Sequence, residues 1–343
     1  MEVNKIYKSL SIIGTEKNTG KTETLNWVLS QLKNSDRTVA VTSIGVDGEG
    51  TDAVSQTSKP EITVYEGMIF VTTENYFKQK QFSAEVLDVA NGTSILGRLI
   101  TAKAKNEGKI LLSGATDTYT LRKIIEKNTA FGADLTVVDG ALFRRSLASP
   151  AVTDAVILAT GAAFSANMEV LVRKTKFVCK LIALPKVNES LSKLLTPIET
   201  GIWCIENNAL HNLDVKSGLN ISTLSAEDIE KIKRSKTVFV AGIVSDKLVD
   251  FLYKKNILKG ILLITKDFTN IFLSQEKFNL LRALGVIVQV LQKTNLIAVT
   301  VNPTSPQGYV LDSDILTSRL KEDISVPVFD VRNGVTSEPV ILL

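Results

Sequence analysis

Cysteine and histidine are scarce in this sequence of 343 residues, which contains Cys179, Cys204 and the single histidine His211. The three residues are separated along the chain, and together they supply too few ligands for a structural zinc site. Two isolated cysteines also make no disulfide framework. We therefore expect these side chains to be ordinary residues of the core or of loops.

The sequence also lacks a concentration of positive charge and a long apolar run. Lys and Arg number 40 against 36 for Asp and Glu, and the two signs are interspersed, so we expect no nucleic-acid partner. No uninterrupted apolar stretch is long enough to cross a bilayer, and the start of the chain lacks the charged and then apolar pattern of a secretory leader. We expect a cytoplasmic protein without a membrane partner.

Apolar residues make up 44% of the chain, enough for a large core. Apolar runs typical of strands alternate with helical patterns, which predicts an α/β fold with a mainly parallel sheet covered on both faces. In the first half we expect strands at 38–44, 61–65, 68–73, 109–114, 135–140 and 155–161, and helices at 94–105 and 117–130. A strand-rich stretch follows from 181 to 223. In the second half we expect strands at 237–242, 260–265, 286–291, 296–302 and 327–331, and helices at 246–256, 274–284 and 312–322.

The most informative stretch covers residues 9–22, where a buried strand, a glycine loop and a helix start follow one another. The apolar strand ends at Gly14. The helix is indicated by four apolar residues at helical spacing, Leu25, Val28, Leu29 and Leu32. The Gly-Lys-Thr sequence between strand and helix is typical of a loop that binds nucleoside triphosphates.

In such a loop, backbone N–H groups face the phosphates, the lysine reaches the β- and γ-oxygens, and the threonine hydroxyl ligates Mg²⁺. We therefore expect ATP and Mg²⁺ as cofactors, with Lys21 as a catalytic residue and Thr22 as a metal ligand. ATP is favoured over GTP because no Asn-Lys-x-Asp sequence follows a strand. The expected nucleotide contacts are Gly14, Thr15, Lys17, Asn18, Thr19, Gly20, Lys21 and Thr22.

The first glycine of the loop lies one residue earlier than in the standard spacing, at Gly14, with Thr15 inside the longer loop. This pattern resembles dethiobiotin synthetase and its relatives among the P-loop proteins. The signature lysine of the partitioning and metallochaperone ATPases in that group is replaced by Glu16, with Lys17 one place later. A lysine that completes the site across a dimer is therefore not implied.

Two carboxylates are candidates for a second metal ligand and a catalytic role. Asp139 ends an apolar strand, where an acid beside a phosphate loop holds Mg²⁺ or its water, although a strand-end Asp that caps a turn is the alternative. Asp47 lies in the glycine-rich loop after the second strand, and we weight a metal or catalytic role and an Asp-Gly turn equally.

Other polar residues carry weaker signals. Arg144 and Arg145 can bind a phosphate or a partner's carboxylate, although exposed arginines are more often only solvated. Lys59 before Pro60 is more consistent with surface lysine than with the substrate lysine of dethiobiotin synthetase. Residues 302–309 form a stiff polar loop after a strand, either a ligand or partner surface or a simple connector.

Beyond the loop, the chain resembles more closely the KamB-type subunit of the reactivases that serve lysine and ornithine aminomutases. The resemblance is carried in order by residues 11–22, 42–49, 138–145 and 302–308. It implies an ATPase that acts with a MutS-like ATPase subunit on a cobalamin-dependent aminomutase and exchanges inactivated cobalamin for intact cofactor. An ATP-dependent ligase or cyclase of the dethiobiotin synthetase type, and a regulatory nucleotide-binding module with little hydrolysis, are alternatives.

The expected organisation is a P-loop nucleotide-binding domain at 1–185, a strand-rich connecting region at 186–235 and a second α/β, Rossmann-like region at 236–343. Length alone suggests about two to three domains. The motifs above all lie in the first domain, except the loop at 302–309. The role of the second half is not indicated by any motif.

Overall fold

A computed structural model describes residues 7–45, 61–94, 97–142, 152–206, 209–215, 218, 221 and 224–332. The chain divides into two compact units, each described below by itself. Unit 1 comprises Met1–Lys176 together with Asn295–Leu343, and unit 2 comprises Phe177–Thr294. Unit 1 is therefore discontinuous along the chain, with unit 2 inserted between its strands β9 and β17.

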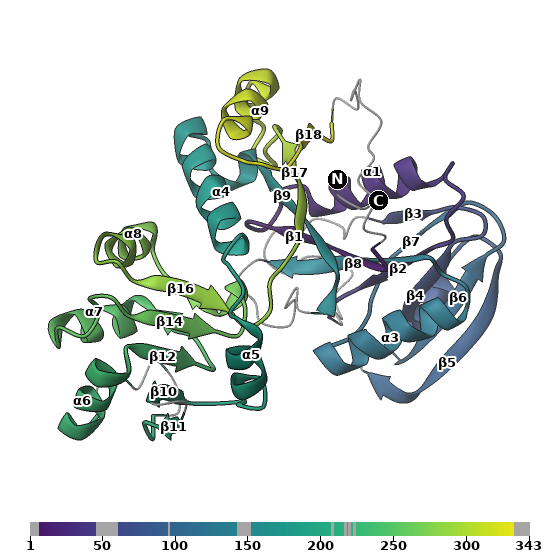
Figure 1. Ribbon diagram of the computed structural model, residues 1–343. Coiled ribbons are helices and arrows are strands. Elements are labelled where there is room, and N and C mark those ends of the chain that lie inside the picture. Colours follow the sequence, from purple (N-terminus) through teal and green to yellow (C-terminus); the bar gives the residue numbers. More distant parts are fainter. Residues whose placement is uncertain are drawn as a thin grey trace. The chain divides into compact units, whose positions relative to one another are not determined.

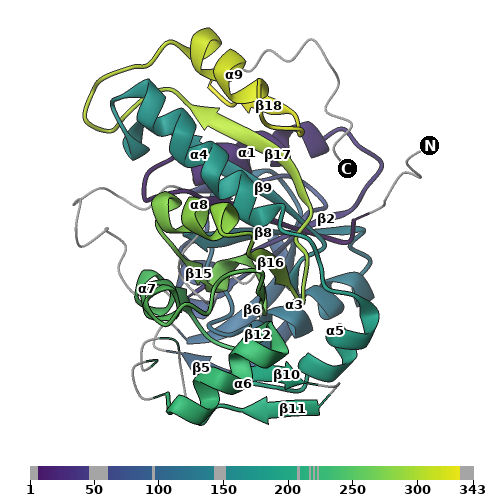
Figure 2. The ribbon, with the colours of Figure 1, turned by 60° about the vertical axis from the view of Figure 1, so that its left-hand side comes forward.

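Unit 1 is built on a nine-stranded sheet with the order β18-β17-β9-β1-β8-β2-β4-β6-β5 (Figures 1 and 2). Its strands are β1 (Ser9–Gly14), β2 (Val39–Ser43), β4 (Ile69–Thr73), β5 (Ala84–Ser94), β6 (Gly97–Ala104), β8 (Leu135–Leu142), β9 (Ala155–Gly161), β17 (Leu296–Asn302) and β18 (Val328–Asp330). The pairings from β18 to β4 are parallel, whereas β6 pairs antiparallel with both β4 and β5. The short strands β3 (Ile62–Val64) and β7 (Gly108–Ile110) form a separate antiparallel pair.

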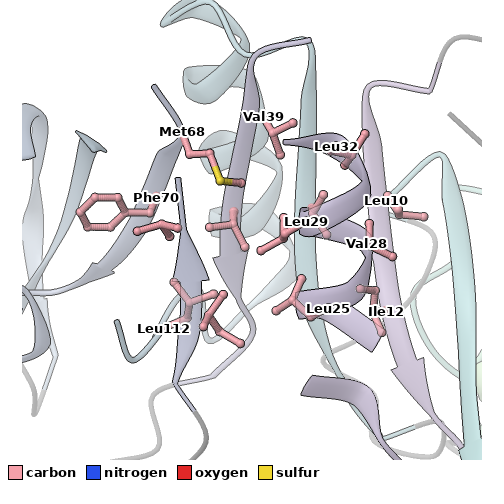
Figure 3. Close-up of a cluster of buried hydrophobic side chains, with 14 of the residues drawn as sticks. Leu10, Ile12, Leu25, Val28, Leu29, Leu32, Val39, Met68, Phe70 and Leu112 are labelled. Atoms are coloured by element: carbon pink, nitrogen blue, oxygen red, sulfur yellow. The ribbon is translucent and has the colours of Figure 1, made fainter. Parts of the chain in front are cut away.

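Helices cover both faces of this sheet. The helix α1 (Lys21–Leu32) packs its apolar side on β1, β2 and neighbouring strands, as the close-up in Figure 3 shows. Leu25 and Leu29 of α1 are completely buried there beside Leu10 and Ile12 of β1. On the opposite face α3 (Thr118–Ala130) packs through Leu121 and other apolar residues against Val71 and Val138. The other α-helices in the described part of unit 1 are α2 (Glu74–Gln79), α9 (Ser313–Lys321) and the first part of α4 (Met168–Ile182).

The predicted α/β class is confirmed, because strands and helices alternate around a large and mostly parallel sheet. The strands expected at 38–44, 135–140, 155–161 and 296–302 correspond to β2, β8, β9 and β17. The helices expected at 117–130 and 312–322 correspond to α3 and α9. The strand expected at 109–114 is limited to β7, which ends at Ile110.

The helix predicted at 94–105 is wrong. This segment is β6, which pairs along its length with β4 on one side and β5 on the other. The buried residues Ile100, Ala102 and Ala104 recur every second position and join the core under α1, which is the period of a strand. Gly97, the first residue of β6, has a φ of +92°, a left-handed conformation that glycine adopts readily.

Unit 2 contains a five-stranded sheet with the order β11-β10-β12-β14-β16. Its strands are β10 (Ile202–Glu206), β11 (Ala209–Asn212), β12 (Thr237–Val240), β14 (Leu262–Thr265) and β16 (Ile287–Val290). The last three are parallel and are connected by α7 (Asp246–Lys254) and α8 (Gln275–Ala283). Unit 2 also contains the helices α5 (Glu189–Leu195) and α6 (Ala226–Ser235), the second part of α4, and the short strand pair β13 (Val244–Ser245) and β15 (Ile271–Phe272).

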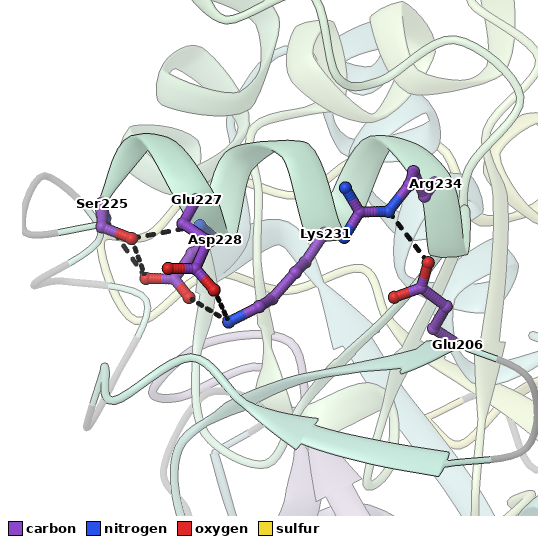
Figure 4. A network of polar contacts seen from close by, with 6 residues as sticks. All are labelled: Glu206, Ser225, Glu227, Asp228, Lys231 and Arg234. Atoms are coloured by element: carbon purple, nitrogen blue, oxygen red, sulfur yellow. Dashed lines mark hydrogen bonds and ion pairs between the residues drawn. The ribbon is translucent and has the colours of Figure 1, made fainter.

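A polar network runs along α6 of unit 2 (Figure 4). Ser225 and Asp228 form a capping box at the start of the helix, and Lys231 forms ion pairs with Glu227 and Asp228. At the other end of the helix, the Nε of Arg234 donates to the Oε1 of Glu206 over 2.9 Å. This hydrogen bond raises the pKa of the Arg234 guanidinium and lowers the pKa of the Glu206 carboxyl. Each charge in this network has a partner of opposite sign within it. We therefore interpret the network as stabilising α6 and not as a ligand site.

Among the described residues, no helix combines the length and the apolar character that a membrane span requires.

Candidate functional site

The segment from Gly14 to Thr22, here called the glycine loop, joins the buried strand β1 to α1. Thr15 N–H donates to the carbonyl of Ala159 in β9 over 3.0 Å, which fixes the start of the loop to the neighbouring strand. Asn18 has a φ of +60° and Gly20 a φ of +93°. These two left-handed residues reverse the chain, because glycine and asparagine tolerate that conformation better than other residues. The loop therefore returns tightly to the helix start at Lys21.

Lys21 folds back over the end of β1. A Cβ atom placed on Gly14 would lie 2.9 Å from both Cγ and Cδ of Lys21, and 3.0 Å from the hydroxyl of Thr19. Such distances are too short for any side chain, so glycine is required at position 14 for the lysine stem to lie there. The stem of Lys21 therefore runs from the first turn of α1 back to the start of the glycine loop.

Hydrogen bonds from buried threonines hold the shape of the glycine loop. Thr19, only 1% exposed, donates its hydroxyl to the carbonyl of Glu16 over 2.8 Å. The helix begins with the bond from Thr24 N–H to the carbonyl of Gly20, over 2.8 Å. Gly20 is the N-cap residue and offers no side chain, so the N–H groups of the first turn have no side-chain cap. An anion is the partner that a helix N-terminus favours.

Asp139 lies on β8, the strand next to β1, in register with Ile12 and with Ser43 of β2. Val137, two residues earlier, packs under α1, while Val138 belongs to the core under α3. Because side chains alternate along a strand, the half-buried carboxyl of Asp139 projects on the face that α1 covers. This face also carries the start of α1, so the structure brings Asp139 to the same side of the sheet as Lys21 and Thr22.

The last residue of β17, Asn302, reaches the glycine loop from far along the chain. A Cβ on Gly20 would lie 2.7 Å from Cβ of Asn302, and one on Gly161 would lie 2.4 Å from the backbone oxygen of Asn302. The Oδ1 of Asn302 accepts the N–H of Thr304 over 3.0 Å, and Tyr309 donates its hydroxyl to the carbonyl of Ala162 over 2.6 Å. Asn302 therefore packs directly against the residue that starts α1, a contact that no local sequence pattern predicts.

A further segment, residues 113–115, was not expected near the site. It pairs with the end of β2, since Gly45 N–H donates to the carbonyl of Ala115 over 2.7 Å and the hydroxyl of Ser113 bonds the carbonyl of Gly45. A Cβ on Gly114 would lie 1.8 Å from the carbonyl oxygen of Ser43, so only glycine fits there. The sequence feature that could have indicated this segment is the Ser-Gly pair that follows the apolar run 110–112.

Several predicted residues lie outside the described part of the chain. These are Asp47, Lys59, Arg144 and Arg145. Within the described part, no three acidic, histidine or cysteine side chains gather as metal ligands. Thr22 and Asp139 are thus the expected metal ligands whose positions the structure describes. Two protein oxygens fit Mg²⁺, which takes one or two protein ligands and completes its octahedron with phosphate oxygens and water.

Both cysteines are buried and unsuited to nucleophilic chemistry. Burial raises the pKa of Cys179 to about 12 and also raises that of Cys204. A raised pKa keeps each thiol protonated at pH 8, where the thiolate is the reactive form. We expect a thiol reagent such as Ellman's reagent to react slowly with the folded protein at pH 8 and with both thiols at once after unfolding in guanidinium. Two thiols that titrate within seconds in the folded protein would contradict this expectation.

In comparisons with known proteins, no family model matches this sequence and no curated protein matches it significantly.

Proposed function

We propose that this chain binds ATP together with Mg²⁺ through the glycine loop and hydrolyses the nucleotide, as a P-loop ATPase. The observation that carries the proposal is the return of Lys21 onto Gly14 while Gly20 starts α1 in a left-handed conformation. A loop of this form combines a lysine, a helix N-terminus without a side-chain cap and backbone N–H groups, and these groups together recognise phosphates. The sequence between Gly14 and Thr22 supports the same reading.

Each residue has a defined task in this proposal. The N-terminus of α1 and the backbone of residues 15–20 bind the phosphates, and Lys21 neutralises the β- and γ-phosphate oxygens. Thr22 and Asp139 are the side chains that would hold Mg²⁺, a cation that offsets negative charge on the phosphates when bound. Asn302 packs on Gly20 and thereby keeps the start of α1 in place.

Replacing Thr22 with alanine tests the metal role. We expect the affinity for ATP in the presence of Mg²⁺ to fall about tenfold, or ~1.4 kcal/mol. With EDTA in place of Mg²⁺ the loss should be much smaller, because the hydroxyl acts through the metal. The control is Thr22→Ser, which keeps the hydroxyl and should bind ATP as the wild type does. Equal losses of affinity with and without Mg²⁺ would contradict the role.

The proposed cellular task is that of a reactivase subunit for a cobalamin-dependent aminomutase. The support is the ordered series of motifs at 11–22, 42–49, 138–145 and 302–308. The structure draws two of these together, since Asn302 contacts Gly20. A tightly held cofactor leaves slowly, and a nucleotide that binds two states of a partner differently can loosen it. Hydrolysis then resets the cycle.

The partner is tested by phosphate release. No arginine finger or catalytic base is evident among the site residues of the described part, so we infer that a partner supplies a transition-state group. Arg144 and Arg145 are the alternative source within the chain. We expect slow ATP hydrolysis by the chain alone, and a rise of about tenfold or more when a MutS-like subunit or a cobalamin-dependent aminomutase is added. Fast turnover without a partner, and no recovery of an inactivated mutase, would favour a stand-alone enzyme.

A further inference from the structure

Three buried threonine hydroxyls form a row from the glycine loop to α4. Thr15 in the loop is 8% exposed, and Thr160 at the end of β9 and Thr175 in α4 are completely buried. The hydroxyl of Thr15 lies 3.4 Å from that of Thr160, which lies 2.8 Å from that of Thr175. The row therefore connects the glycine loop to a helix on the far side of β9.

The two bonds in the row differ in strength. Thr15 donates at 3.4 Å both to Thr160 and to the carbonyl of Ala159, and these distances are long for a hydroxyl donor. A hydroxyl held this weakly can turn to a better acceptor at small cost, and a phosphate oxygen is such an acceptor. The bond between Thr160 and Thr175 has the usual length for two hydroxyls, and either hydroxyl can be its donor. Its direction can therefore reverse when Thr15 stops donating to Thr160.

The last residue of the row lies where the chain passes from unit 1 into unit 2. The helix α4 is continuous from Met168 to Ile182, and the division falls between Lys176 and Phe177. On the unit 1 side, Lys176 forms an ion pair with Asp323 over 2.9 Å. On the unit 2 side, the ring of Phe177 packs against that of Phe278 in α8, with centroids 5.6 Å apart. Contacts that fix the helix to each unit thus occupy consecutive residues next to Thr175.

We propose that Thr160 and Thr175 couple nucleotide occupancy of the glycine loop to α4 and, through it, to unit 2. The inference rests on the proposed function, since it takes the glycine loop as the nucleotide site. A phosphate that engages the hydroxyl of Thr15 releases Thr160, which changes how Thr175 is held. Because a helix is stiff along its axis, this change reaches Phe177 and its packing on α8. By thermodynamic linkage, whatever binds unit 2 then also changes the affinity for the nucleotide.

Hydrogen exchange of the full chain tests the coupling, with and without Mg²⁺ and a non-hydrolysable ATP analogue. In the wild type we expect the analogue to change exchange in peptides from the second half of α4 and from α8. Thr160→Val should abolish this change, while analogue affinity stays within about threefold of the wild type. Thr160→Ser, which keeps the hydroxyl, should retain the change. If Thr160→Val does not fold, Thr175→Val removes the same bond from the side of α4.

The matched control is Thr72→Val in β4. Thr72 is also completely buried in unit 1, and its hydroxyl donates to the carbonyl of Leu111 over 2.8 Å, away from the row. This variant should retain the change in unit 2. The coupling is overturned if the wild type binds the analogue without a change in unit 2, if Thr160→Val keeps the change, or if Thr72→Val loses it as well. A wild type that does not bind the analogue overturns the proposed function and the coupling with it.

Discussion

Replacing Lys21 with alanine is expected to weaken ATP binding about 100-fold, or ~2.7 kcal/mol, with no loss of folding stability. The ammonium neutralises phosphate charge, and a hydrogen bond to a charged group contributes about this much. The side chain is partly exposed and lies over the glycine loop rather than in the hydrophobic core. Calorimetric titration with ATP and Mg²⁺ measures the affinity, and thermal unfolding of the nucleotide-free protein measures the stability.

Two comparison variants sharpen this result. Lys21→Met keeps the apolar stem that packs on Gly14 and removes only the charge, so it should lose as much affinity as Lys21→Ala. Lys17→Ala removes an exposed charge from the same loop and tests whether that lysine, also an expected nucleotide contact, contributes comparably. If both Lys21 variants bind ATP as tightly as the wild type, the glycine loop is not the nucleotide site.

Replacing Asp139 with asparagine is expected to preserve ATP binding and to slow hydrolysis at least tenfold, or about 1.4 kcal/mol of barrier. The amide keeps the shape of the side chain and loses the charge that would hold Mg²⁺ on the α1 side of β8. Phosphate release under saturating ATP measures the effect.

The matched control for Asp139 is Asp154→Asn, which changes an acid on the other side of β1. Asp154 accepts the N–H groups of Lys8 and Ser9 at the opposite end of the strand, so its loss should affect stability and leave turnover per folded molecule unchanged. Turnover of Asp139→Asn at the wild-type rate would contradict a metal role for Asp139. If only Asp47→Asn stops turnover, the roles of the two carboxylates are reversed.

The parts of the site that could be predicted are those encoded by neighbouring residues. The buried strand, the glycine loop and the periodic apolar face of α1 lie within 24 consecutive residues, Ser9–Leu32, and each follows from local patterns. Asp139 was found because it follows an apolar run typical of a buried strand, although β8 continues past it to Leu142. The structure then shows that this strand, β8, lies beside β1, because Ile12 pairs with Asp139.

Contacts between distant residues could not be predicted in this way. Asn302 reaches Gly20 only because β17 lies next to β9, after the chain has passed through the whole of unit 2. The row of Thr15, Thr160 and Thr175 depends on the same long-range packing. The alanines in β6 favour a helix, but β6 pairs with β4 on one side and with β5 on the other. Tertiary contacts therefore override the local helix propensity of this segment.

The most direct test of the account is a calorimetric comparison of ATP, ADP and AMP binding to the wild-type protein with Mg²⁺ present. A glycine loop that recognises phosphates through Lys21 and the start of α1 predicts that ATP binds at least about 100-fold more tightly than AMP, with ADP between them. Equal affinity for the three nucleotides, or no binding of ATP at all, would contradict the proposal that this loop is a triphosphate site.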